Sequence, residues 1–396
     1  MRPTRKPAYK PTLAYYAAFI ALGLVSAVLG PTLPALADIT ETSFGQISVL
    51  FIALSLGYVL GSMLGGYWLD RSSGHPVMIG MLVSMIISLA VTPIIPFLWL
   101  LAAIIFLTGL ARGVVDVGGN TLLMWVHGEN VGPFMNALHL FYGVGSFLAP
   151  VIIAQALHIT GGISWGYWTI AILLIPPILQ LFFTQSPLRL ETDSRAETKK
   201  EKGLIILLMA LFLFCYSSMA NIFGGWIYSY SLESNLASET NAAYLTSLFW
   251  GAFTVGRFIS IPIAARYRPN SILTADLLGC LFSVGLMLLF PKASFAIWVG
   301  AAGLGLSVAS MFPTIMTLAE RCLDVTGRIT SRFVIGSALG GMLPPWLVGQ
   351  LFETTGPKAV ISTIFGFLVV QGLVFAFLMK KAGSDQVVWG QSAPRA

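Results

Sequence analysis

The sequence predicts an all-α membrane protein with twelve transmembrane helices in two pseudo-symmetric six-helix bundles. Of its 396 residues, 56% are hydrophobic and only 10% are charged, and the mean hydropathy is +0.83. This composition lies outside the range of soluble globular domains. Apolar runs of about 20 residues, the length that crosses about 30 Å of hydrocarbon, recur along the whole chain. The expected spans are 12–36, 44–69, 76–96, 98–124, 132–157, 165–185, 204–231, 242–265, 271–290, 294–319, 329–352 and 358–380.

The first span follows a basic amino-terminal segment, a pattern that also occurs in secretion signals. Its apolar run is too long for a signal peptide, so we expect a transmembrane helix there. Lysine and arginine gather at one set of helix ends, and only Lys292 and Lys358 lie at the other set. Cytoplasmic loops carry such an excess of positive charge, so both termini are predicted to lie in the cytoplasm. This distribution accounts for the net charge of +6 without a nucleic-acid partner.

The loop after the second span reads GYWLDRSSG, from Gly66 to Gly74. Asp70 lies at a helix end, where its carboxylate can accept hydrogen bonds from the N-terminus of a neighbouring helix. Asp70 could in this way hold an inner gate shut. The loop also resembles the cytoplasmic gating motif of the major facilitator superfamily, and this resemblance implies that Gly66, Asp70, Arg71 and Gly74 form the gate. The corresponding loop of the second half, around Arg266, lacks the aspartate, so the first half alone is expected to carry this latch.

The fourth span carries Arg112, Asp116 and Asn120 at four-residue spacing, which places them on one face of a helix. Charged residues inside a membrane usually mark a substrate or ion path, although Arg112 and Asp116 could also form a purely structural pair. Asp116 and His139 are expected at similar depth. We therefore expect them to meet across the first half, with Asn120 and Asn136 below them. Such a group could hold a sodium ion at Asp116 or relay a proton, while a hydrogen-bonded core histidine remains the alternative for His139.

A polar segment, QSPLRLETDSRAETKKEK, follows the sixth span. It predicts a cytoplasmic linker at 186–203 between a bundle at 1–185 and a second bundle at 204–381, with a cytoplasmic tail at 382–396. The halves also resemble each other, because Gly145 and Pro150 in the fifth span recur 195 residues later as Gly340 and Pro345. Transporters built from such repeats bind their substrate between the halves, near the middle of the membrane.

Substrate-binding residues are expected from both halves. Asn221 and Trp226 lie on the seventh span and Trp250 on the eighth, where aromatic rings can pack on a sugar and an amide can bond its hydroxyls. Tryptophan and tyrosine near helix ends also serve as interfacial anchors, which is the interpretation we prefer for Tyr230. Arg112 and Tyr142 are assigned to the same binding surface from the first half.

Two further polar pairs receive structural interpretations. Ser43 and Gln46 have the spacing of a capping box at the start of the second span. Arg257 on the eighth span and Asp276 on the ninth are expected to pair with each other inside the second half. Neither pair is therefore assigned to substrate or ion binding.

The duplicated six-helix unit and the GYWLDRSSG loop resemble the major facilitator superfamily. Within it, the order of several short segments is similar to the sodium-dependent glucose transporter group related to fucose permease. The resemblance implies a monosaccharide transporter driven by sodium or protons, with the coupling acid at Asp116. The segments are Leu29-Gly30-Pro31-Thr32-Leu33, Gln46-Ile47-Ser48, Asp116 with Asn120, Ala137-Leu138-His139-Leu140-Phe141, and Tyr244-Leu245-Thr246-Ser247 with Phe249-Trp250 and Gly256-Arg257.

No nucleotide-binding loop and no convincing hydrolase constellation occurs in the sequence, so neither an ATP-driven pump nor an enzyme is expected. We expect a secondary transporter that moves a hexose with sodium or a proton by alternating access. It should need no cofactor and act as a monomer in the lipid bilayer of a cell membrane. The lack of an Asn-x-Ser/Thr sequence favours a bacterial inner membrane. The alternatives are a proton-coupled exporter of amphipathic compounds and a sugar sensor that does not transport.

Overall fold

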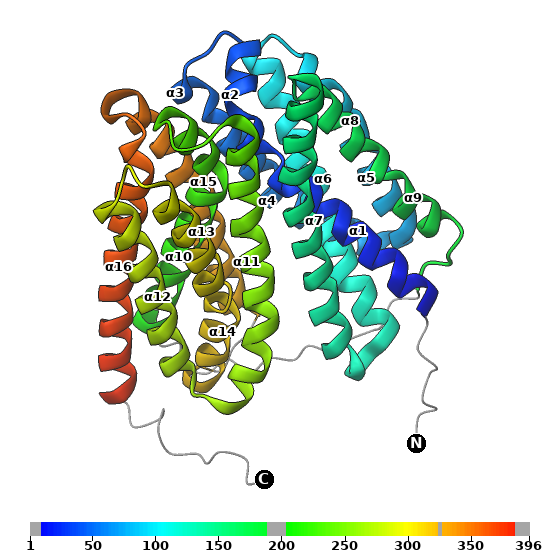
Figure 1. The fold of residues 1–396 in the computed structure, drawn as a ribbon. Helices are drawn as coiled ribbons and strands as arrows, with labels where there is room; N and C mark the ends of the chain where they lie inside the picture. Colours follow the sequence, from blue (N-terminus) through cyan, green and yellow to red (C-terminus); the bar gives the residue numbers. More distant parts are fainter. Residues whose placement is uncertain (1–8, 188–202, 324–326, 385–396) are drawn as a thin grey trace.

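A computed structural model describes residues 9–187, 203–323 and 327–384, and every regular element in these ranges is a helix (Figure 1). Twelve of the described helical segments are long and apolar enough to cross a membrane, which confirms the all-α membrane fold. Most of the expected linker and tail lies outside the described residues. The helices are α1 Tyr9–Ala27, α2 Leu29–Ile39, α3 Phe44–Ile47, α4 Val49–Arg71, α5 Gly74–Val91, η1 Thr92–Ile94, α6 Leu98–His127, η2 Gly128–Asn130, α7 Gly132–Thr160, α8 Ser164–Leu173, α9 Ile175–Phe182, α10 Gly203–Glu233, α11 Glu239–Arg266, α12 Pro269–Leu289, α13 Ser294–Val308, α14 Met311–Cys322, α15 Gly327–Thr355 and α16 Lys358–Ser384.

Proline explains why three of the expected spans are each divided into two helices. α2, α9 and α14 carry Pro31, Pro176 and Pro313 within their first three residues. Proline has no amide hydrogen and is best accommodated in the first turn of a helix, so a new helix begins just before each of these three prolines. The short helix α3 begins instead with the expected capping box, because the side chains of Ser43 and Gln46 each accept from the other's backbone amide.

Glycines bring α4 and α6 into close contact. A Cβ atom added to Gly57 or Gly61 of α4 would overlap the main chain of α6, and one added to Gly109 or Gly113 would overlap that of α4. Small residues at these positions let two transmembrane backbones approach closely. The side chains that flank the contact, on both helices, are therefore placed within hydrogen-bonding distance of each other.

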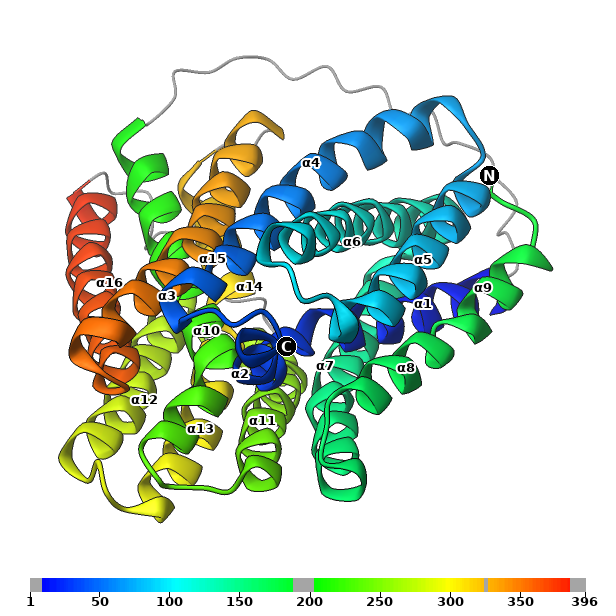
Figure 2. The same cartoon turned by 90° about the horizontal axis from the view of Figure 1, so that it is seen from above.

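The two halves of the chain lie side by side, α1–α9 on one side and α10–α16 on the other (Figures 1 and 2). They are joined at one end, where α7 packs on α11, α2 on α10, and α3 on α15. We call this the closed end. There the amide of Gly45 donates to Glu353 Oε1 at 2.8 Å, and Gln350 Nε2 donates to the Gly45 oxygen at 2.7 Å. Deeper in the interface, Ser247 Oγ donates to the Phe147 oxygen at 3.1 Å.

At the opposite end, where α1 begins and α16 ends, the two halves diverge (Figure 1). We call this the open end. All six residues at 261–266, the last of α11, are exposed, so no neighbouring helix covers this part of α11 on any side. The space between the halves is therefore reached from the open end. The positive-charge pattern predicts that this end faces the cytoplasm, and that orientation remains a prediction.

Candidate substrate and cation site

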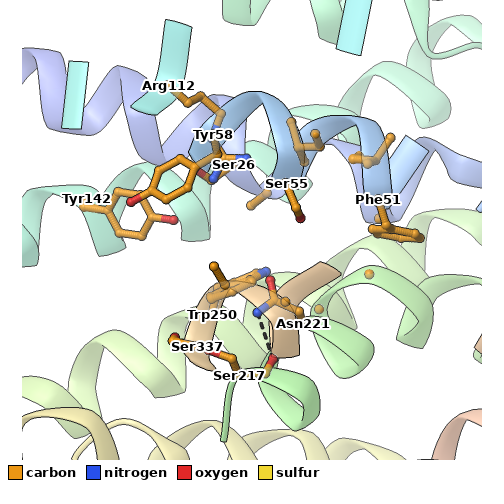
Figure 3. A pocket seen from close by; sticks show the side chains of 18 of the residues that line it. Ser26, Phe51, Ser55, Tyr58, Arg112, Tyr142, Ser217, Asn221, Trp250 and Ser337 are labelled. Carbon is orange, nitrogen blue, oxygen red and sulfur yellow. Dashed lines mark hydrogen bonds between the residues drawn. The ribbon is translucent and has the colours of Figure 1, made fainter. Parts of the chain in front are cut away.

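A cavity of about 340 Å³ lies between the two halves (Figure 3). Its size suits a small solute, because ligand pockets have volumes of about 300–1,000 Å³. Helices α1, α2, α4, α6 and α7 line one side, and α10, α11, α14 and α15 line the other. The polar side chains of its wall are Ser26, Ser55, Tyr58, Arg112, Tyr142, Ser217, Asn221, Trp250 and Ser337.

Asp116 is held by side chains of α4 and α6. The hydroxyl of Tyr58 donates to Asp116 Oδ2 at 2.5 Å, and Asn120 Nδ2 donates to Oδ1 at 3.0 Å. The four-residue spacing therefore places Asn120 as expected. Tyr58 is a functional candidate that the sequence interpretation missed. Its position in the sequence could have indicated this role, because Tyr58 lies between Gly57 and Gly61, and such small residues predict close packing of α4 on another helix.

Arg112 lines the cavity but makes no hydrogen bond or ion pair with the described residues. Its Nε atom is buried without a partner, and its guanidinium lies 5.8 Å from the centre of the Tyr58 ring. The structural pair with Asp116 that we considered is therefore not formed. Helical side chains lean toward the N-terminus, so Arg112 leans away from a residue four positions later. This order of base before acid is also the weaker arrangement on a helix.

His139 is not brought to Asp116, contrary to the expectation from depth. Its ring packs edge-on against Phe19 of α1 at 5.9 Å, and its imidazole makes no hydrogen bond to Asp116. α1 packs on both α6 and α7, and the Phe19 ring fills the space beside Gly119 of α6. Asn136 is exposed near the open end of α7. Of the four residues expected to meet, only Asp116 and Asn120 are in contact. Equal depth in the membrane did not reveal that α1 lies between α6 and His139 of α7.

Tyr142, Asn221 and Trp250 line the cavity, as their assignment to substrate binding requires (Figure 3). Asn221 Nδ2 donates to the Ser217 oxygen at 2.8 Å, which leaves the amide oxygen of Asn221 without a donor among the described residues. The indole Nε1 of Trp250 is buried without a partner. These groups are available to a bound solute.

Trp226 lies outside the cavity, so its assignment to substrate binding is wrong for this conformation. Its side chain is 0% exposed, Nε1 donates to the Pro345 oxygen at 2.9 Å, and the ring stacks on Phe352 at 5.4 Å. Five residues separate it from Asn221 on α10, which is about 7.5 Å along the helix and more than a third of a turn around it. Trp226 therefore packs between the halves toward the closed end.

The expected pair of Arg257 and Asp276 is also not formed. Ser310, at the break between α13 and α14, donates its hydroxyl to Asp276 Oδ2 at 2.5 Å. The Arg257 guanidinium lies over the ring of Phe253 at 4.6 Å, and its Nε is buried without a partner. Each half thus holds one buried carboxylate, bound by a neighbouring hydroxyl rather than by a cation.

The expected gate residues lie at the open end. Asp70 is exposed in the last turn of α4, and the Arg71 guanidinium lies 3.6 Å from the centre of the Tyr67 ring. Gly74 begins α5, and its amide donates to Ser186 Oγ at 3.1 Å. Gly66 has open space beside it. Their role in gating stays a prediction.

Twelve spans whose halves enclose a polar cavity, open at one end only, define a membrane transporter. The model of the Major Facilitator Superfamily matches residues 15–345, and the chain belongs to this family. It is 31% identical to sodium-dependent glucose transporter 1 of Xenopus laevis over 395 aligned residues, covering 91% of this chain and 80% of that protein. It is 29% identical to major facilitator superfamily domain-containing protein 4A of Mus musculus over 459 aligned residues, covering 91% and 90%.

Solved structures show the same fold at low sequence identity. A D-xylose–proton symporter aligns with a TM-score of 0.74 and 12% identity over 95% of this chain and 98% of that one. A bacterial homologue of the human lysosomal transporter Spinster, in an inward-facing conformation, aligns with a TM-score of 0.73 and 13% identity over the full length of both chains.

The family confirms several expectations. The protein is a multi-pass membrane transporter of a small molecule and not an enzyme. Sugar transporters of this family need no cofactor, because the coupling cation is itself transported.

Proposed function

We propose that the protein carries a monosaccharide across a cell membrane by alternating access, together with a sodium ion or a proton bound at Asp116. The observation that carries this proposal is the bonded group of Tyr58, Asp116 and Asn120 in the first half. It lies one helical turn from Arg112 in the cavity wall. Carboxylate and amide oxygens are ligands that hard cations prefer, and a carboxylate can equally carry a proton.

The cavity wall supports a sugar as the solute. Trp250 offers an aromatic face, Asn221 an unpaired amide oxygen, and Ser217 and Ser337 hydroxyls at 2.5 Å from each other. These groups can bond the hydroxyls of a sugar, while the larger apolar part of the wall can pack against its ring. The sodium-dependent glucose transporters among the relatives support the same choice.

The proposal also includes the moving parts of the transporter, its orientation and its membrane. The bundles at 1–185 and 204–381 move against each other, both termini face the cytoplasm, and the described conformation is then inward-facing. The protein acts as a monomer in a cell membrane, which we assign to a bacterial inner membrane. One positive charge that crosses 100 mV gains about 2.3 kcal/mol, so one coupled ion supports about fifty-fold accumulation of a neutral sugar.

Uptake of labelled hexose into proteoliposomes tests the proposal, with sodium and proton gradients imposed separately. Asp116→Asn should abolish accumulation against a gradient. Asp38→Asn, which alters an exposed acid of α2 outside the cavity, is the matched control and should accumulate sugar normally. Accumulation that persists in Asp116→Asn would refute the coupling site, and no hexose flux under any gradient would refute the sugar.

A further inference from the structure

The wall of the cavity contains a cation that makes no hydrogen bond and no ion pair with the described residues. Arg112 is permanently charged and offers five N–H donors. None of them donates to a described residue, and Nε is enclosed where bulk water does not reach it. Burying a charge is costly unless it is paired and hydrogen-bonded. Because Arg112 lines the cavity, a solute in the cavity is placed to supply the acceptor that the described residues do not.

The nearest carboxylate is already engaged elsewhere. Both oxygens of Asp116 accept hydrogen bonds, one from Tyr58 and one from Asn120. Arg112 is the only charged residue among those that line the cavity in the described part of the chain. The buried Nε1 of Trp250 adds another unused donor to the wall. The cavity thus presents positive charge and an excess of donors to a solute.

The second half contributes positive charge on the way into the cavity. Arg257 lies seven residues beyond Trp250 on α11, which is about 10 Å nearer the open end. Thr254, about one turn earlier on α11, lies against Gly143 of α7, so the face of α11 that carries Arg257 is turned toward the first half. The Nε atom of Arg257 is likewise buried without a partner. An approach lined by one sign of charge concentrates solutes of the opposite sign.

We propose that the physiological substrate is an acidic monosaccharide, of the hexuronate type, whose carboxylate binds to the Arg112 guanidinium. The inference rests on the proposed monosaccharide transport and adds the charge of the substrate to it. A guanidinium and a carboxylate form two parallel hydrogen bonds, a geometry that a sugar hydroxyl cannot reproduce. With the carboxylate on Arg112, the sugar ring lies toward Trp250 and Asn221 across the cavity (Figure 3).

This arrangement also gives the coupling a physical basis. A cation bound at Asp116 neutralises the carboxylate one helical turn from Arg112, and this strengthens the attraction of Arg112 for an anion. By linkage, the bound anion raises the affinity of Asp116 for the cation by the same factor. One acidic sugar and one monovalent cation then cross the membrane together without net charge.

The test compares two labelled sugars that differ only at C6, D-glucuronate and D-glucose, in proteoliposomes with the same cation gradient. We expect the wild-type protein to take up glucuronate with a kcat/KM roughly tenfold to a hundredfold above that for glucose, the range for a charged hydrogen-bonded pair. Arg112→Gln should bring this ratio to about one, and Arg112→Lys, which keeps the charge but not the paired geometry, should give an intermediate ratio. Arg266→Gln removes an exposed guanidinium at the end of α11 and should keep the wild-type ratio.

The outcomes separate the two proposals. Uptake of glucose in preference to glucuronate refutes the acidic substrate and leaves monosaccharide transport standing, whereas uptake of neither sugar refutes both. A wild-type ratio in Arg112→Gln refutes the role of Arg112. Should the variants fold poorly, thermal stabilisation of the purified wild-type protein by each sugar gives the same comparison, and equal stabilisation by both sugars overturns the proposal.

Discussion

Replacing Gly61 by alanine should separate α4 from α6 and release Asp116 from Tyr58. A Cβ atom on Gly61 would lie 2.7 Å from the carbonyl carbon and 2.8 Å from the Cα atom of Leu110. Ordinary contacts between carbon atoms are about 3.5–4.0 Å, so the helices must move apart by about 1 Å. That movement lengthens the 2.5 Å hydrogen bond between Tyr58 and Asp116 beyond the normal range for such a bond.

The magnitude follows from the two losses. Overpacking costs about 1–3 kcal/mol, and a hydrogen bond to a charged group contributes about 1.5–3 kcal/mol. We expect Gly61→Ala to unfold at a lower temperature and to lose most of its gradient-driven accumulation of sugar. Thermal unfolding of the purified protein and uptake into proteoliposomes measure these two effects.

A matched control removes the effect of helix propensity. Gly80 of α5 has open space beside it, so Gly80→Ala creates no overlap. Alanine favours a helix interior over glycine by about 1 kcal/mol, so this variant should be as stable as the wild type or slightly more stable. Wild-type stability and accumulation in Gly61→Ala, or an equal loss in Gly80→Ala, would show that the glycine contact does not hold the site together.

Three other predictions follow from the closed end, the tryptophans and the charge balance. Glu353→Ala removes the acceptor of the Gly45 amide and should favour opening of the closed end by about 1 kcal/mol, or about fivefold; the effect is this small because the carboxylate is exposed. Spin labels at positions 38 and 354, which are exposed and lie on opposite halves, would report this opening as a longer distance between the labels. An unchanged distance would show that the bond from Gly45 to Glu353 does not hold the closed end together. Trp226→Ala should lower the free energy of unfolding by about 3–5 kcal/mol, while Trp250→Ala should mainly raise the KM for sugar. The reverse pattern would contradict the placement of Trp226 outside the cavity and of Trp250 in its wall. An inside-negative potential should accelerate uptake of a neutral hexose, because the hexose and one cation together carry a net positive charge. It should leave glucuronate uptake unchanged, because the anion and the cation cancel. A glucuronate uptake rate that depends on voltage would contradict this one-to-one charge balance.

The sequence predicted those features that depend on local pattern. Hydropathy and length locate the twelve spans, because lipid demands long apolar helices whose backbone bonds are satisfied internally. The spacing of Asp116 and Asn120 predicts their contact, since both lie on the same face of one helix. The capping box of α3 was predicted for the same reason.

Features that depend on the neighbours of a helix could not be predicted. Equal depth suggested that Asp116 and His139 meet, but the contact of Phe19 with both α6 and α7 requires knowledge of where α1 lies. Trp226 and Trp250 look alike in sequence, and only the packing of the two halves places one inside the interface and the other in the cavity wall. Tyr58 is likewise recognised only after α4 and α6 are paired.

The repeat in the sequence now has a structural meaning. Asp116 of the first half corresponds to Ser310 of the second, and His139 corresponds to Val334. Ser310 donates its hydroxyl to Asp276 of α12, away from the cavity lining, whereas Asp116 is bound by Tyr58, which lines the cavity. Val334 is itself part of the cavity wall. The same scaffold thus bonds a carboxylate to a residue of the cavity wall in the first half and to a residue outside that wall in the second. Under the proposed function, cation coupling is therefore assigned to the first half and binding of the sugar ring to the second.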